Sequence, residues 1–182
     1  MEPKITTPVV KGVIITLILI VFGLVMYFTG QFENRALGSI QYLILFGGIV
    51  WGCVQYANQM NGAVTFGNVF SHGFKTTAVI IVLLSIYTFL SFKFIFPDIQ
   101  EKIIESARQK MESDNKMSDE QIQQAIDLTR KFFLPFAIGG IIIGFGILGA
   151  LASLLGAAVA KKNPHASTPF TAEVNQIGEI QK

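Results

Sequence analysis

Four long runs of hydrophobic residues, separated by polar stretches, dominate the pattern along the chain. Each run has about the 20 residues that a helix needs to cross the hydrocarbon core of a bilayer. We place the four spans at about 12–30, 37–57, 74–96 and 133–160. Because the runs are continuously apolar, the pattern predicts transmembrane helices and excludes an ordinary globular domain.

The segment between the third and fourth spans shows a different pattern, in which apolar residues recur at helical spacing among charged ones. Ser118 and Gln121 form a capping box, which marks the start of a second helix within this segment. We therefore predict an amphipathic helical hairpin at 98–131, outside the membrane, with its apolar stripes facing each other or lying on the headgroups. Pro135 either opens a new helix or kinks a helix that continues from the hairpin.

The predicted architecture is all-α. It is a polytopic membrane protein of four transmembrane helices, with the extramembrane amphipathic helical hairpin between the third and the fourth. Residues 1–162 make up this membrane domain. The tail, 163–182, has no hydrophobic periodicity, so we expect it to be disordered.

Charge is scarce in the chain and is confined to a few segments. Charged residues make up 14% of the sequence, against roughly 25% in soluble domains. The formal net charge of +2 is too small for a protein that tracks nucleic-acid phosphates, so we expect no nucleic-acid partner. Lys75 and Lys93 lie near the two ends of the third span and no span has a charge deeper in its interior, which argues against ion-coupled transport through a membrane-embedded carboxylate.

Basic residues near the spans predict the orientation. Lys4 and Lys11 precede the first span and Lys161 and Lys162 follow the last, which favours cytoplasmic termini under the positive-inside rule. The basic residues between the third and fourth spans argue for the opposite orientation. We predict cytoplasmic termini for this multi-pass protein.

Small residues in the second and fourth spans predict close helix packing. Gly48 and Gly52 form a small-xxx-small pair, and further small residues recur every seven positions in the fourth span, with others offset by three. Such residues let helices approach where lipid provides no hydrophobic drive for association, although a pore lining or dimer seam is an alternative use. The predicted packing residues are Gly48, Gly52, Gly139, Gly146, Gly149, Ser153 and Gly156.

Polar residues around the start of the third span are the candidates for chemistry. His72 with Lys75 would suit a headgroup phosphate, whereas the simpler interpretation is an interfacial histidine solvated by water. The candidate polar or headgroup site consists of Gln55, Asn58, Asn68, His72 and Lys75.

The single cysteine, Cys53, allows no intrachain disulfide, and we interpret it as a small buried residue. The sequence shows no phosphate-loop, metal-ligand or Ser-His-Asp motif, so we expect no catalytic residue, no metal and no cofactor.

A family resemblance rests on the stretch before the third span, Asn61-Gly-Ala-Val-Thr-Phe-Gly-Asn-Val-Phe-Ser-His-Gly-Phe74, together with Pro97-Asp98 and the glycine-rich last span. These features resemble the small four-span bacterial membrane proteins grouped as domain-of-unknown-function family 4199. The resemblance covers about 8–162, and its most specific part is Phe-Gly-x-x-Phe-x-x-Gly-Phe with Pro-Asp. It implies the fold, the topology class and a location in the bacterial inner membrane, and it transfers no catalytic residue.

Three functional hypotheses follow. The first is a noncatalytic integral membrane protein that acts by helix packing and presents the hairpin to a partner, either a second copy or another membrane protein. The second is a passive small-molecule transporter or channel subunit, motivated by the polar end of the second span. The third is an enzyme that acts on a lipid around His72 and Lys75.

Overall fold

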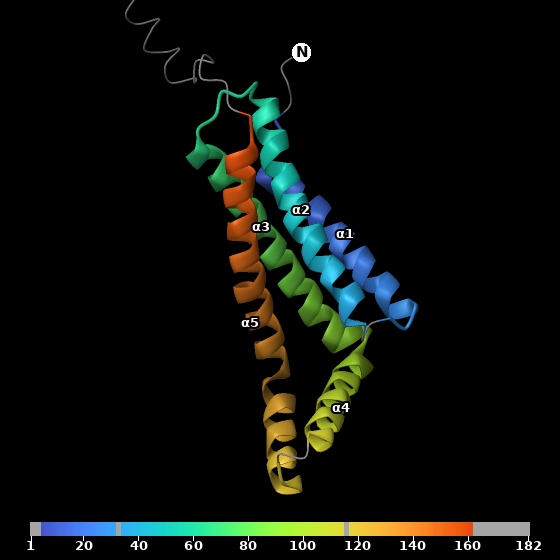
Figure 1. The fold of residues 1–182 in the computed structure, drawn as a ribbon. Coiled ribbons are helices and arrows are strands. Elements are labelled where there is room, and N and C mark those ends of the chain that lie inside the picture. The colour runs from blue at the N-terminus through green and yellow to red at the C-terminus, as the bar shows by residue number, and fades with distance from the viewer. Residues whose placement is uncertain (1–4, 32–33, 115–116, 162–182) are drawn as a thin grey trace, which may run out of the picture. The chain divides into compact units, whose positions relative to one another are not determined.

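The computed structural model describes residues 5–31, 34–114 and 117–161. They form the helices α1 (Pro8–Phe28), α2 (Arg35–Gln59), α3 (Phe66–Leu90), α4 (Pro97–Ser113) and α5 (Asp119–Val159), with a π-helical segment η1 (Ser91–Ile95) after α3 (Figure 1). No strand occurs in these ranges. Four helical segments, 8–28, 36–59, 66–95 and 119–159, are long and apolar enough to cross a membrane. The prediction of an all-α polytopic membrane protein is confirmed, and the tail at 163–182 lies outside the described residues.

Local capping signals decide where the first helix begins. The Thr7 side chain accepts a hydrogen bond of 3.3 Å from the backbone N–H of Val10, and Pro8 occupies the first helical turn. A threonine cap followed by proline is a favoured helix start, because proline has no N–H that would need a partner there. Helix α1 therefore begins four residues before the predicted span, and Lys11 lies inside the helix.

Turn and cap residues also decide where the second helix ends and the third begins. Asn61 and Gly62 have φ values of 51° and 76°, in the left-handed region that glycine and asparagine tolerate best. Thr65 Oγ1 then accepts a hydrogen bond of 3.2 Å from the N–H of Asn68, so Thr65 caps α3.

The chain divides into two compact units. The first unit comprises the residues up to 81 and those from 145 onward, and thus contains α1, α2, the first part of α3 and the last part of α5. In this unit the start of α1, the α2–α3 turn and the end of α5 lie at the same end, which we call the terminal end (Figure 1). The second unit, 82–144, contains the rest of α3, η1, α4 and the first part of α5.

Helix α4 and the start of α5 form a hairpin around a small apolar core. Its buried residues are Ile104, Ile122, Ile126 and Phe133, with Phe92, Ile103 and Met111 packed against them. The apolar stripes of the hairpin therefore face each other, which is one of the two predicted arrangements. The predicted capping box is also present, because the Ser118 N–H donates to Gln121 Oε1 over 3.0 Å and the Gln121 N–H donates to Ser118 Oγ over 3.4 Å.

Helix α5 runs without interruption from the hairpin into the last span. It has 41 residues and includes Pro135, so this proline does not open a new helix. At 1.5 Å per residue its axis is roughly 60 Å long, about twice the thickness of a hydrocarbon core. At least part of α5 must therefore extend beyond the hydrocarbon region.

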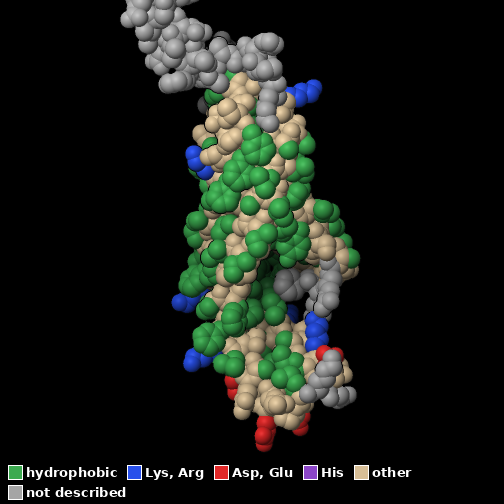
Figure 2. All heavy atoms as spheres, turned by 60° about the vertical axis from the view of Figure 1, so that its left-hand side comes forward, with side chains coloured by type: hydrophobic (Ala, Val, Ile, Leu, Met, Phe, Trp, Pro, Cys, Tyr) green, Lys and Arg blue, Asp and Glu red, His purple; other side chains and the backbone are tan. Residues whose placement is uncertain are grey.

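The exposed side chains suit a lipid environment. Hydrophobic side chains cover the visible face of the long helices, whereas Asp and Glu appear only over the hairpin (Figure 2). The sequence agrees, because every Asp and Glu of the described residues lies within 98–127. Apolar side chains exposed along the spans would be unfavourable in water and are expected in lipid.

Candidate functional site: a buried lysine and histidine

Helices of the first unit approach each other at several of the predicted small residues. A Cβ built on Gly48 would lie 3.1 Å from Ile15 of α1, and one on Gly156 would lie 2.6 Å from Cys53 Cβ of α2. A Cβ on Gly149 would collide with the side chain of Thr77 in α3. At these positions α1, α2, α3 and α5 leave no room for a side chain.

The other predicted packing residues differ in how closely neighbouring atoms surround them. Ser153 is fully buried, and its hydroxyl donates to the Gly149 carbonyl over 2.6 Å. A Cβ on Gly146 would lie 3.9 Å from Ile81, and a Cβ on Gly139 would meet no atom within 4 Å. Sequence analysis missed Gly73, where a Cβ would lie 2.5 Å from Cys53 Sγ and 2.7 Å from Ser153 Oγ.

Lys11 is the most unusual residue of the first unit. Its side chain is 0% exposed, and Nζ donates a hydrogen bond of 2.9 Å to the backbone carbonyl of Gly52 in α2. Nζ also lies 5.8 Å from the centre of the Tyr56 ring, within the range of a cation–π contact. Gly52 makes room for the lysine stem, since a Cβ there would lie 3.5 Å from Lys11 Cδ.

The burial of Lys11 corrects the expectation that the spans carry no interior charge. That expectation treated Lys11 as a flanking residue, whereas Lys11 is the fourth residue of α1 and points into the first unit. Ionisable side chains within membrane helices are rare and usually functional. In the described parts of the first unit, 5–31, 34–81 and 145–161, the sequence contains no Asp or Glu that could neutralise it.

His72 lies beside the same tyrosine. Its ring stacks on Tyr56 with centroids 4.2 Å apart and an interplanar angle of 11°. The side chain is 6% exposed, and within the described ranges its Nε2 atom has no hydrogen-bond partner. Tyr56 is thus a common neighbour of His72 and Lys11.

The remaining members of the predicted polar site differ in their exposure. The Oε1 atom of Gln55 is buried and, among the described residues, makes no hydrogen bond. Asn58, Asn68 and Lys75 are exposed. The structure adds Lys11 to the candidate residues, and the position of this lysine next to a span start had concealed it.

A pair of hydrogen bonds joins the chain before α1 to the end of α2. The Thr6 N–H donates to Gln59 Oε1 over 3.1 Å, and Gln59 Nε2 donates to Thr6 Oγ1 over 2.8 Å. This pair, the Thr6–Gln59 clasp, lies at the terminal end near Lys11.

Within the described ranges no group of three or more His, Cys, Asp or Glu side chains is arranged to hold a metal ion.

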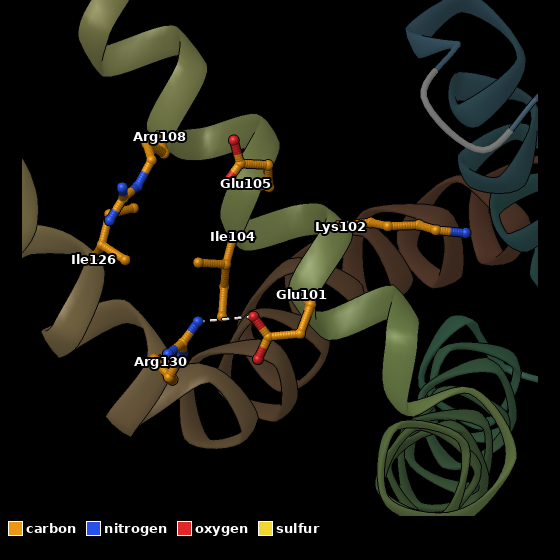
Figure 3. A pocket seen from close by; sticks show the side chains of 7 residues that line it. All are labelled: Glu101, Lys102, Ile104, Glu105, Arg108, Ile126 and Arg130. Carbon is orange, nitrogen blue, oxygen red and sulfur yellow. Dashed lines mark hydrogen bonds and ion pairs between the residues drawn. The ribbon is translucent and has the colours of Figure 1, made fainter.

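The hairpin carries a second feature, an open pocket of about 480 Å³ between α4 and α5. Figure 3 shows Ile104 and Ile126 between its charged side chains, with Arg130 reaching from α5 to Glu101 of α4. The Arg130–Glu101 ion pair measures 2.7 Å, and Arg108 donates to Gln123 over 2.6 Å. Because the ion pair is exposed, it contributes at most about 1 kcal/mol to stability.

Long apolar helices and a charged hairpin define the class, a multi-pass helical membrane protein. The chain belongs to the family described as protein of unknown function (DUF4199), whose model matches residues 11–162. This match confirms the family suggested by the sequence resemblance. A search of curated proteins and a search of solved structures each returned no match.

Proposed function

We propose that this protein is a noncatalytic component of the bacterial inner membrane that presents its α4–α5 hairpin to a protein partner. The observation that carries this proposal is the way the hairpin distributes its apolar residues. Its inner stripes are buried against each other, yet Leu128, on the outer face, is 57% exposed. Phe132 and Phe136 follow at intervals of one turn and are also exposed.

A contiguous row of exposed apolar side chains, such as Leu128, Phe132 and Phe136, is typical of a contact surface, whereas a single one is not. Leu128 stands next to Asp127 and two residues before Arg130, both exposed, so it lies on a polar surface. The partner is a second copy of the chain or another membrane protein. Close packing of the helices around Gly149 and Gly156 supports a structural role for this part of the first unit, since these positions have no space for a ligand.

We expect site-specific photocrosslinking in cells to detect the partner. A photoreactive residue at Leu128 should give a discrete protein adduct, because this side chain faces outward on the hairpin. The matched control is Leu17 of α1, which is 55% exposed and should react with lipid alone. An adduct of twice the chain mass identifies a second copy, and any other mass identifies another partner. Absence of a protein adduct at Leu128, or the same adduct at Leu17, would contradict the proposal.

The proposal includes cytoplasmic termini and hence a hairpin on the opposite side of the inner membrane. The positive-inside rule supports it, because Lys75 and Lys161 are exposed in the first unit, whose described residues carry no acidic side chain. On the hairpin, basic side chains are accompanied by acidic ones, as in the 3.4 Å Lys102–Asp98 pair.

Labelling with a membrane-impermeant maleimide tests the orientation. Because the native Cys53 is buried, the unmodified chain should give little background. Asp114→Cys, at the exposed end of α4, should react in intact spheroplasts, and Lys161→Cys should react only after permeabilisation. The reverse pattern would show that the termini lie outside.

A further inference from the structure

We propose that Lys11 and His72 form a binding site for the phosphate group of an anionic lipid, at the terminal end of the first unit. This site is distinct from the hairpin surface and does not depend on the proposed partner. The argument rests on hydrogen-bonding capacity, charge, depth in the membrane and access.

Hydrogen-bonding capacity remains at both residues. A protonated lysine has three N–H donors, and Lys11 uses one of them on the Gly52 carbonyl. His72 adds Nε2, which is buried and has no partner in the described ranges. Leaving such groups unsatisfied costs free energy, roughly 1–3 kcal/mol each, so a ligand that satisfies both is favoured.

The charge of the first unit selects an anion. Its described residues include Lys11 and Lys161 near the terminal end, and no Asp or Glu. A lysine near the membrane that has no carboxylate partner among the described residues attracts phosphate oxygens, which accept several hydrogen bonds at once. A neutral or cationic ligand would leave this charge uncompensated.

The depth of the site matches a headgroup phosphate. Lys11 is the fourth residue of α1 and His72 the seventh of α3, so both lie about 5–10 Å from the ends of their helices. That is the boundary between hydrocarbon and headgroups, where basic pockets between helices bind anionic lipids. A soluble anion would share the chemistry but would have no reason to prefer this depth.

Access requires the lysine to turn outward. The side chain is fully buried, and its four methylenes allow Nζ to leave the Gly52 carbonyl and snorkel toward the headgroups. The Thr6–Gln59 clasp lies on the same side and consists of two hydrogen bonds that can exchange for water. In this proposal the inward position of Lys11 is the lipid-free conformation, and lipid binding exchanges the Gly52 carbonyl for phosphate oxygens.

Native mass spectrometry of the full-length protein in a nonionic detergent tests the site by titration with phosphatidylglycerol. Lys11→Met should weaken binding about 10- to 100-fold, the effect of losing one or two charged hydrogen bonds. His72→Phe, which keeps the stack on Tyr56, should weaken lipid binding by a smaller factor, and Lys11→Arg should retain binding.

The matched control is Lys75→Met, which changes an exposed lysine of the same unit. Its affinity for the lipid should stay within about twofold of that of the unmodified protein. Gel filtration and circular dichroism verify that each variant is folded, and Lys11→Gln replaces Lys11→Met if the latter is not.

Three further arms identify the occupant. Phosphatidylethanolamine should bind at least about 10-fold more weakly than phosphatidylglycerol, because its headgroup carries its own ammonium. If inorganic phosphate displaces phosphatidylglycerol at concentrations similar to those at which the lipid itself binds, the ligand is a free anion and the lipid assignment is overturned. Glu2, nine residues before Lys11, is one of the chain's own carboxylates outside the described residues and is the competitor that the experiment tests. If Glu2→Gln binds the lipid and the unmodified protein does not, the Glu2 carboxylate occupies the site and the proposal fails. The proposal also fails if Lys11→Met binds the lipid with unchanged affinity.

Discussion

Replacing Phe133 by alanine is expected to open the hairpin. Phe133 is 8% exposed in the hairpin core and meets Phe92 edge-to-face with ring centroids 5.0 Å apart. Removal of a buried phenylalanine costs about 3–5 kcal/mol, so hydrogen exchange of the α4 and early α5 amides should accelerate by about 100-fold or more.

Phe136 provides the control for this prediction. It lies one turn further along α5 and is 67% exposed, so Phe136→Ala should change exchange by less than about threefold. Equal acceleration in the two variants would mean that the buried core does not hold α4 against α5. Hydrogen exchange resolved by mass spectrometry separates this local effect from unfolding of the first unit.

Replacing Gly149 by leucine is expected to destabilise the first unit. The collision of a Cβ with Thr77 involves the branched part of that side chain, which has little freedom to move within a helix. Overpacking costs about 1–3 kcal/mol for added methylenes, and a whole leucine side chain should reach at least the upper value. The expected result is a clear loss of resistance to unfolding in a denaturing-detergent titration.

Gly139→Leu is the matched control in the same helix. A Cβ at Gly139 meets no atom within 4 Å, so the leucine can extend into lipid or detergent and stability should change by less than about 0.5 kcal/mol. A Gly149→Leu variant as stable as Gly139→Leu would show that α3 and α5 do not approach each other as described.

Hydropathy and capping patterns predicted the long apolar helices and the hairpin because these depend on local sequence. The capping box at Ser118 and the cap at Thr65 bring together atoms only three residues apart, so sequence alone could identify them. The seven-residue recurrence in the last span was less informative. Gly139 and Ser153 lie two heptads apart and drift by only about 40° around a straight helix, yet Ser153 is buried whereas a Cβ at Gly139 meets no atom within 4 Å. Their packing therefore depends on which helices lie alongside, which the recurrence does not encode.

The site was harder to predict because it depends on tertiary contacts. Hydropathy assigns Lys11 to the edge of a span, although Thr7 and Pro8 already indicate an earlier helix start. The inward direction of the side chain depends on space beside the bare Gly52 backbone, and Gly52 lies 41 residues away. The stack of His72 on Tyr56 likewise joins two helices, and no local spacing rule predicts it.

The hydrogen bond between Lys11 and Gly52 also constrains the order of assembly during synthesis. The acceptor is made 41 residues after the donor, which at about 5–20 residues per second is a delay of about 2–8 s. During that interval α1 can meet the membrane before α2 exists, and its lysine must then remain at the aqueous boundary. The lysine can turn inward only after α2 has arrived, so its burial follows the insertion of the second helix and does not require the chain beyond it to be finished.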